Sequence, residues 1–116
     1  MRQYESGLQG EALAEDYLCR RGMQVIARRY RAADGEIDLI LLAEDTVVFA
    51  EVKARPRARA GMGLASVTPD KQRRMTHAAM HFLVEREYWG HPVRFDVVEI
   101  TRDGILHIPN AFMAAE

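Results

Sequence analysis

Apolar residues recur along the chain with two periods, one typical of amphipathic helices and one typical of strands. Helical spacing predicts helices over residues 4–22 and 68–90, and Thr68 and Pro69 are suited to the cap and first turn of the second helix. Period-two and β-branched patterns predict strands over residues 23–31, 35–43, 46–54, 93–101 and 105–108. Proline and glycine predict a loop over residues 55–66.

The predicted order of elements is α-β-β-β-α-β-β, which indicates an α/β fold with a mixed β-sheet flanked by helices. The second helix forms a crossover, so the strand that follows it should run parallel to the strand that precedes it. A length of 116 residues with 48% hydrophobic composition suits one compact domain, and we assign residues 1–116 to it.

Charge is distributed unevenly along the chain. The formal net charge is −1, which gives no bulk reason to expect nucleic acid as a partner, yet residues 52–75 carry seven basic side chains and one acidic one. Cys19 is the single cysteine, which excludes a disulfide framework and a cysteine-rich metal site. No signal-peptide pattern and no long apolar run is present, so we expect a cytoplasmic protein without a membrane partner.

The two most apolar strands, in the stretch "GEIDLILLAEDTVVFAEVKAR", are interrupted by three charged residues, Asp38, Glu51 and Lys53. If "ED" forms the hairpin connection, Asp38 lies opposite Glu51, and Glu36 lies opposite Lys53. Cross-strand partners have β-carbons about 4.5–5.5 Å apart, and like charges destabilise such a pair. A bound divalent cation, Mg²⁺ or Mn²⁺, accounts best for two facing carboxylates, because hard cations take oxygen ligands. Lys53 would project from the same face as Glu51.

This constellation predicts a metal-dependent phosphodiesterase. A divalent cation activates water and neutralises charge on a phosphodiester, and Lys53 can stabilise developing negative charge. The simpler interpretation is that these are solvated positions, with Glu51 and Lys53 forming a surface pair that contributes little to stability.

The motifs "GEIDLI", "VFAEVKAR" and, after a helix, "RFDVV" resemble those of the YraN family of small bacterial proteins. That family belongs to the restriction-endonuclease-like superfamily with the PD-(D/E)xK signature, and the resemblance implies a core similar to that of archaeal Holliday-junction resolvases. It implies Asp38 and Glu51 as metal ligands, Lys53 as the catalytic lysine and Glu11 as an additional carboxylate near the metal. Ile37 stands at the signature's proline, and Arg29 stands where an asparagine is expected.

The basic band that follows the acidic strands is predicted to bind a nucleic-acid backbone, that of DNA, with the glycines leaving the loop mobile over the site. Its members are Arg55, Arg57, Arg59, Lys71, Arg73 and Arg74. The leading function is a Mg²⁺- or Mn²⁺-dependent endonuclease that acts on branched or otherwise structured DNA. Such an enzyme would need two sites to resolve a junction, so a homodimer is plausible. The alternative is a non-catalytic nucleic-acid-binding or adaptor protein with a vestigial site.

Three other features bear on the site. Lys53 and Lys71 are the only lysines among 16 basic residues, which suggests a requirement for compact ammonium groups. His77 and His81 have a spacing that can bind zinc, but without a third ligand we expect them on an exposed polar face. Asp96 is expected to be a structural partner of Arg94 and not a catalytic group.

Overall fold

The computed structural model describes residues 3–115. In chain order the elements are α1 (Gln3–Arg20), β1 (Gln24–Ala32), β2 (Gly35–Ala43), β3 (Thr46–Arg55), the 3₁₀ turn η1 (Leu64–Ser66), α2 (Pro69–Glu85), β4 (Val93–Thr101) and β5 (Gly104–Phe112). The predicted order α-β-β-β-α-β-β is therefore confirmed. The strands form a single sheet in the order β1-β2-β3-β4-β5, in which β3 and β4 are parallel and the other neighbours are antiparallel.

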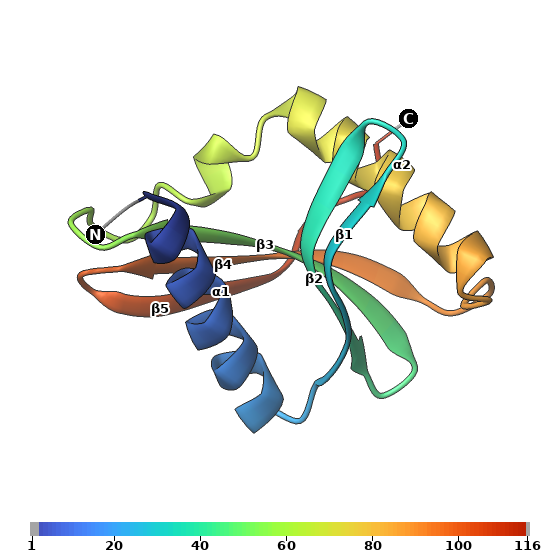
Figure 1. Cartoon of the computed structure of the whole chain (residues 1–116), viewed down its shortest axis with the longest axis horizontal. Coiled ribbons are helices and arrows are strands. Elements are labelled where there is room, and N and C mark those ends of the chain that lie inside the picture. Colours follow the sequence, from blue (N-terminus) through green and yellow to red (C-terminus); the bar gives the residue numbers. More distant parts are fainter. Residues whose placement is uncertain (1–2, 116) are drawn as a thin grey trace.

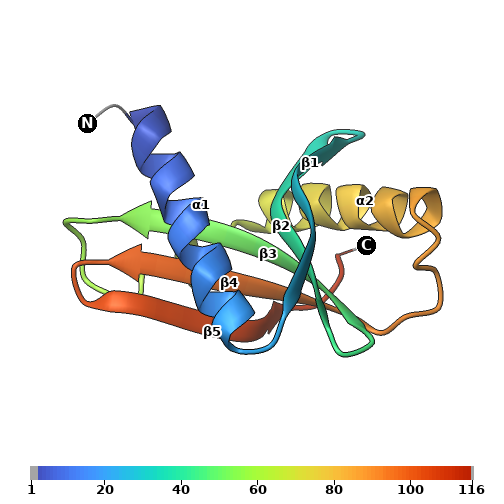
Figure 2. The same ribbon diagram turned by 60° about the horizontal axis from the view of Figure 1, so that its bottom comes forward.

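The two long helices lie on opposite faces of this sheet (Figures 1 and 2). Successive residues of β3 contribute in turn to the two apolar layers, because successive side chains of a strand point to opposite faces of the sheet. Phe49 packs with Phe82 of α2 in one layer, and Val48 packs with Leu18 of α1 in the other. The fold is thus a mixed sheet flanked by helices, as predicted.

The β2–β3 hairpin has the predicted register. Ala43 pairs with Thr46 across the "ED" connection, and pairing continues to Leu39 opposite Ala50. Glu44 takes the left-handed conformation with φ 57°, which closes this tight turn. The ladder ends at Leu39, so Asp38 and Glu51 follow the register of the hairpin without being a hydrogen-bonded pair of strand residues. The expected pairing of Glu36 with Lys53 is not found, because the β2–β3 ladder ends at Leu39 and Ala50; on the other edge of β2, Glu36 pairs with Arg31 of β1 at 3.5 Å.

Two glycines allow the helices to approach the strands that carry the acidic residues. A Cβ on Gly35 would lie 2.0 Å from the backbone oxygen of Arg74, so the start of β2 packs directly on α2. A Cβ on Gly10 would lie 2.6 Å from Cβ of Ala54, so α1 packs equally closely on β3. Larger residues at either position would separate the elements that enclose the site.

The predicted bounds of two elements were wrong. The helix predicted to extend to residue 90 ends at Glu85, because Glu87 takes a left-handed conformation with φ 59° and the Tyr88 amide donates to the carbonyl of Leu83. This is a glycine-type helix stop formed without glycine. The last strand is longer than predicted and continues to Phe112 along β4. Within residues 3–115 no helix is both long and apolar enough to cross a membrane.

Candidate active site

A cleft of about 230 Å³ opens between the start of β2, the middle of β3 and the first turns of α2. Its lining residues are Gly35, Glu36, Asp38, Glu51, Lys71, Arg74 and Met75. Asp38 and Glu51 therefore face the same cavity, as the register of the hairpin predicts. Each comes from a strand at the point where β2 and β3 cease to pair.

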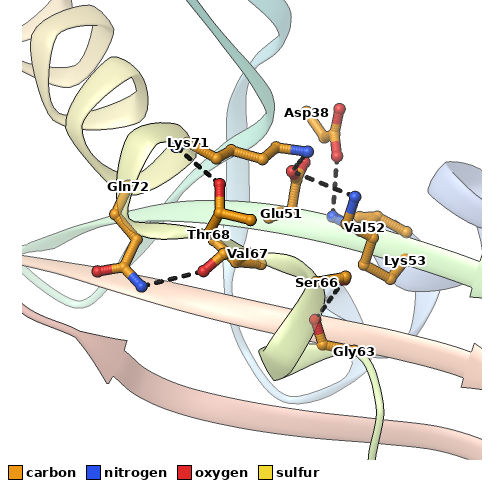
Figure 3. A network of polar contacts seen from close by, with 10 residues as sticks. All are labelled: Asp38, Glu51, Val52, Lys53, Gly63, Ser66, Val67, Thr68, Lys71 and Gln72. Carbon is orange, nitrogen blue, oxygen red and sulfur yellow. Dashed lines mark hydrogen bonds and ion pairs between the residues drawn. The ribbon is translucent and has the colours of Figure 1, made fainter.

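Asp38 is held in place by the backbone of β3. Its Oδ2 accepts a hydrogen bond from the Val52 amide at 2.8 Å, in the position where strand pairing would otherwise continue (Figure 3). Burial, together with the adjacent Glu51 carboxylate, raises the pKa of Asp38 to about 8. Such a shift means that a second negative charge at this position is costly unless a cation lies close by.

Glu51 forms ion pairs with two ammonium groups. Its side chain is 4% exposed, and its Oε2 lies 3.9 Å from Lys53 Nζ and in closer contact with Lys71 Nζ. Figure 3 shows the lysines converging from β3 and from α2. Although these ion pairs are present, Oε2 accepts no hydrogen bond of ordinary geometry within the described part of the chain. The two lysines neutralise Glu51 without fully satisfying it as an acceptor.

The lysines respond to this environment in opposite ways. Burial and the neighbouring Lys71 ammonium lower the pKa of Lys53. Burial alone would lower the pKa of Lys71 as well, but the Glu51 carboxylate raises it above its ordinary value. Lys71 is therefore the principal counter-ion of Glu51, and Lys53 is the ammonium that is less strongly compensated.

The donor set fits a hard divalent cation. The half-buried carboxylate of Asp38 lies beside the buried carboxylate of Glu51, and one oxygen of Glu51 lacks a well-formed hydrogen bond. Mg²⁺ is commonly held by one or two carboxylates and completes its coordination with water and substrate phosphate. No group of three or more His, Cys, Asp or Glu side chains gathers at metal-binding distance among residues 3–115. A cation held here would thus take two ligands from the protein, Asp38 and Glu51, and would leave its other positions for water and phosphate.

Glu11 lies next to this pair but not within it. Burial and the Asp38 carboxylate raise the pKa of Glu11, while Arg29 opposes that shift. Glu11 Oε2 accepts a hydrogen bond from Arg29 at 2.8 Å, and neither residue lines the cleft. Arg29 adopts a left-handed conformation with φ 50°, which asparagine tolerates better than arginine and which gives a physical reason for the asparagine expected there.

The predicted basic band divides into three parts. Arg55, Arg57 and Arg59 are exposed on the end of β3 and the loop that follows it. Arg73 and Arg74 are half-exposed in the first turns of α2, where both pair with Asp70. Lys71, expected on the nucleic-acid backbone, instead points into the cleft and contacts Glu51. Thr68 caps α2 as predicted, because its hydroxyl accepts a hydrogen bond from the Lys71 amide at 3.2 Å. The cap fixes where α2 begins and so the position of Lys71 in its first turn.

The sequence analysis missed Glu99, a carboxylate that anchors the glycine loop. Glu99 pairs in register with Lys53 and is 1% exposed. Its Oε1 accepts from the Gly61 amide at 2.6 Å, and its Oε2 accepts from the Gly63 amide. A Cβ on Gly63 would lie 2.5 Å from that oxygen, so any larger residue here would displace the Glu99 carboxylate. The loop expected to be mobile is thus tied to β4, and the signal for this was an acid within the apolar strand "RFDVVEIT".

We expect Glu99→Ala to lower the free energy of unfolding by about 1–3 kcal/mol, because it leaves the buried Gly63 amide without an acceptor. Glu99→Gln keeps one oxygen and should lose less. Urea unfolding of both variants measures the difference, and amide exchange at Gly61 and Gly63 should accelerate most in the alanine variant. Unchanged exchange at both glycines would contradict the anchoring role.

Two other predictions are confirmed. Asp96 is a structural residue: it is fully buried and accepts hydrogen bonds from Arg94 at 3.0 and 3.2 Å and from the Asn110 amide at 2.9 Å. His77 and His81 are exposed on α2, where His77 contacts Asp34 and His81 contacts the Tyr30 hydroxyl. Both histidines help to hold the β1–β2 hairpin against α2.

The chain matches the family model described as "Uncharacterised protein family UPF0102" over residues 10–100. It is similar to a UPF0102 protein of Saccharophagus degradans, with 44% identity over 113 residues that cover 97% of this chain and 96% of the relative. A UPF0102 protein of Clostridioides difficile (strain 630) is 35% identical over 114 residues, covering 97% of this chain and 100% of the relative. Both matches extend across the strands and helix that form the cleft. The chain therefore belongs to the UPF0102 family, which is the YraN family indicated by its sequence motifs.

Proposed function

We propose that this protein is a Mg²⁺- or Mn²⁺-dependent endonuclease that hydrolyses phosphodiester bonds in structured or branched DNA. One observation carries the proposal: the half-buried carboxylate of Asp38 and the buried carboxylate of Glu51 share a cleft with the Lys71 ammonium, and Lys53 Nζ lies 3.9 Å from Glu51 Oε2. Opposite charges arranged in this way are suited to a cation and an anionic ester together. The resemblance to PD-(D/E)xK nucleases leads to the same assignment.

Each residue has a distinct task in this proposal. Asp38 and Glu51 hold the divalent cation, which when bound supplies activation of water and neutralisation of phosphate charge. Asp38 is oriented for this by the Val52 amide. Lys53 projects its ammonium beside the same carboxylates and favours the transition state, where negative charge on the attacked phosphate is greatest. Glu11, compensated by Arg29, adds negative charge beside the pair without being a ligand.

The exposed arginines near the cleft bind the DNA backbone. Arg57 and Arg59 extend from the loop anchored by Glu99, and Arg73 and Arg74 extend from the first turns of α2. Contacts of this kind position the duplex without reading its sequence. Two copies of the chain would bring two such sites to a four-way junction, which makes a homodimer the expected state on a branched substrate.

Mn²⁺ binding tests the assignment of the metal. Wild type should bind Mn²⁺ weakly alone and more tightly with DNA, because phosphate completes the coordination. Asp38→Asn should lose at least about tenfold in affinity, corresponding to roughly 1.4 kcal/mol. Asp34→Asn is the matched control, since it removes an exposed carboxylate that pairs with His77. Calorimetry with and without DNA measures these affinities, and equal Mn²⁺ binding by wild type and Asp38→Asn would reject the assignment.

A further inference from the structure

Lys71 reaches the site from a different element than the predicted catalytic lysine does. Its backbone lies in the first turn of α2, whose start is fixed by the Thr68 cap and by a hydrogen bond from Gln72 Nε2 to the Val67 carbonyl at 3.0 Å. From there the side chain crosses the cleft to Glu51, and Figure 3 shows its ammonium beside the Glu51 carboxylate and close to Asp38. The Lys71 side chain is 30% exposed and lines the cleft.

The position of this ammonium conflicts with metal binding. Lys71 Nζ contacts the Glu51 oxygen that has no well-formed hydrogen bond, which is the oxygen best placed to bind a cation. Both cations cannot hold that oxygen at once, because two positive charges in contact repel strongly in a cleft of low dielectric constant. When a divalent cation binds, Lys71 must leave Glu51 and needs another anion.

The other carboxylates that line the cleft are already engaged, because Asp38 is the second proposed metal ligand and Glu36 pairs with Arg31 at 3.5 Å. Arg74 also lines the cleft, but its guanidinium is paired with Asp70 at 3.1 Å. Within the described residues, Lys71 is the side chain whose ammonium lies both against a proposed metal ligand and toward the open cleft. A phosphate of a bound nucleic acid would accept the released ammonium.

On the basis of the proposed function, we propose that Lys71 is an exchangeable counter-ion that couples metal binding to phosphate binding. Without metal it neutralises Glu51, and with metal and nucleic acid it transfers to a backbone phosphate. Each ligand then favours the other, and the coupling is reciprocal by thermodynamic linkage. Lys71 is accordingly a positioning residue that restricts metal loading to the nucleic-acid-bound protein.

The test is Mn²⁺ affinity without and with a DNA duplex that carries phosphorothioate linkages. Lys71→Met should bind Mn²⁺ alone about tenfold more tightly than wild type, because the competing ammonium is gone. The same variant should gain little further affinity when DNA is added, whereas wild type should gain severalfold. Arg31→Met removes an equal charge from β1, where Arg31 pairs with Glu36, and should change Mn²⁺ affinity much less.

A second measurement uses unmodified wild-type protein and does not depend on the folding of any variant. The chain has two lysines, Lys53 and Lys71, so their ε-methylene signals in a ¹³C NMR spectrum can be followed separately. Adding Mg²⁺ and DNA should move the Lys71 signal more than the Lys53 signal.

The outcomes separate this inference from the proposed function. If wild type binds Mn²⁺ through Asp38 but Lys71→Met binds with unchanged affinity and unchanged dependence on DNA, the exchange is overturned and the metal site stands. If no variant binds Mn²⁺ under either condition, both fall. A Lys71 signal that stays constant while Mg²⁺ and DNA bind also overturns the exchange.

Discussion

Replacing Lys53 by alanine should abolish phosphodiester cleavage while leaving DNA affinity within a few-fold of wild type. Lys53 Nζ lies 3.9 Å from Glu51 Oε2. In the proposed nuclease its charge would therefore act on the attacked phosphate and not on the outlying backbone. An interaction that strengthens only in the transition state lowers the rate when it is removed and hardly changes binding. Single-turnover cleavage and gel-shift titration, performed on the same labelled DNA, separate the two effects.

A variant that lacks Arg57 and Arg59 should show the opposite behaviour, with weaker DNA binding and intact cleavage. Arg57 and Arg59 are exposed on the loop anchored by Glu99, outside the carboxylate cleft. Removing both should weaken DNA binding and flatten its dependence on salt by about two phosphate contacts, since each contact releases counter-ions. Cleavage at saturating enzyme should be retained. A Lys53→Ala variant that loses affinity as strongly as this double variant would contradict the separation of roles.

Asp38→Asn should stabilise the metal-free protein above neutral pH. The folded protein raises the pKa of Asp38 from 3.8 to about 8, so between these values the folded state retains a proton that the unfolded state has released. Stability contributed by this group is therefore present below pH 4 and is lost as pH rises toward 8. Since one pKa unit corresponds to 1.36 kcal/mol, the full loss amounts to several kcal/mol, and asparagine does not incur it.

Urea unfolding between pH 5 and pH 9 in the presence of a chelator measures this difference. The wild-type and Asp38→Asn curves should diverge as pH rises, and Asp34→Asn, whose carboxylate is exposed, should follow wild type through this range. Mg²⁺ should restore stability to wild type and not to Asp38→Asn, because a ligand stabilises only the state that binds it. Parallel stability curves for wild type and Asp38→Asn would show that the folded protein does not raise the pKa of Asp38.

Much of the fold follows from local sequence patterns. The "ED" connection between two alternating apolar runs determined the register of β2 and β3, and the crossover helix determined that β4 runs parallel to β3. The sequence was enough to place Asp38 and Glu51 on the same face of the sheet, because strand side chains alternate with a period of two and a short connection sets the register of the hairpin. The end of α2 could not be predicted, because Glu87 forms the left-handed stop that glycine usually forms.

The parts of the site that sequence did not predict depend on contacts between distant elements. Lys71 lies 20 residues beyond Glu51, and only the packing of α2 on β2 at Gly35 brings it to the cleft. Its one signal was the scarcity of lysine in an arginine-rich chain. Glu99 gave a weaker signal, because an acid within a strand does not reveal that two amides of a loop will meet it.

Single-turnover cleavage of a panel of labelled DNAs tests the central claim most directly, using wild type and Asp38→Asn with Mg²⁺, with Mn²⁺ and with a chelator. The panel should contain a four-way junction, a flap, a nicked duplex, an intact duplex and an RNA. We predict cleavage by wild type of at least one branched or interrupted DNA, only with metal, and none by Asp38→Asn at equal DNA occupancy. Wild type that binds these DNAs with the expected salt dependence but cleaves none in any metal would contradict the nuclease and favour a non-catalytic nucleic-acid-binding protein.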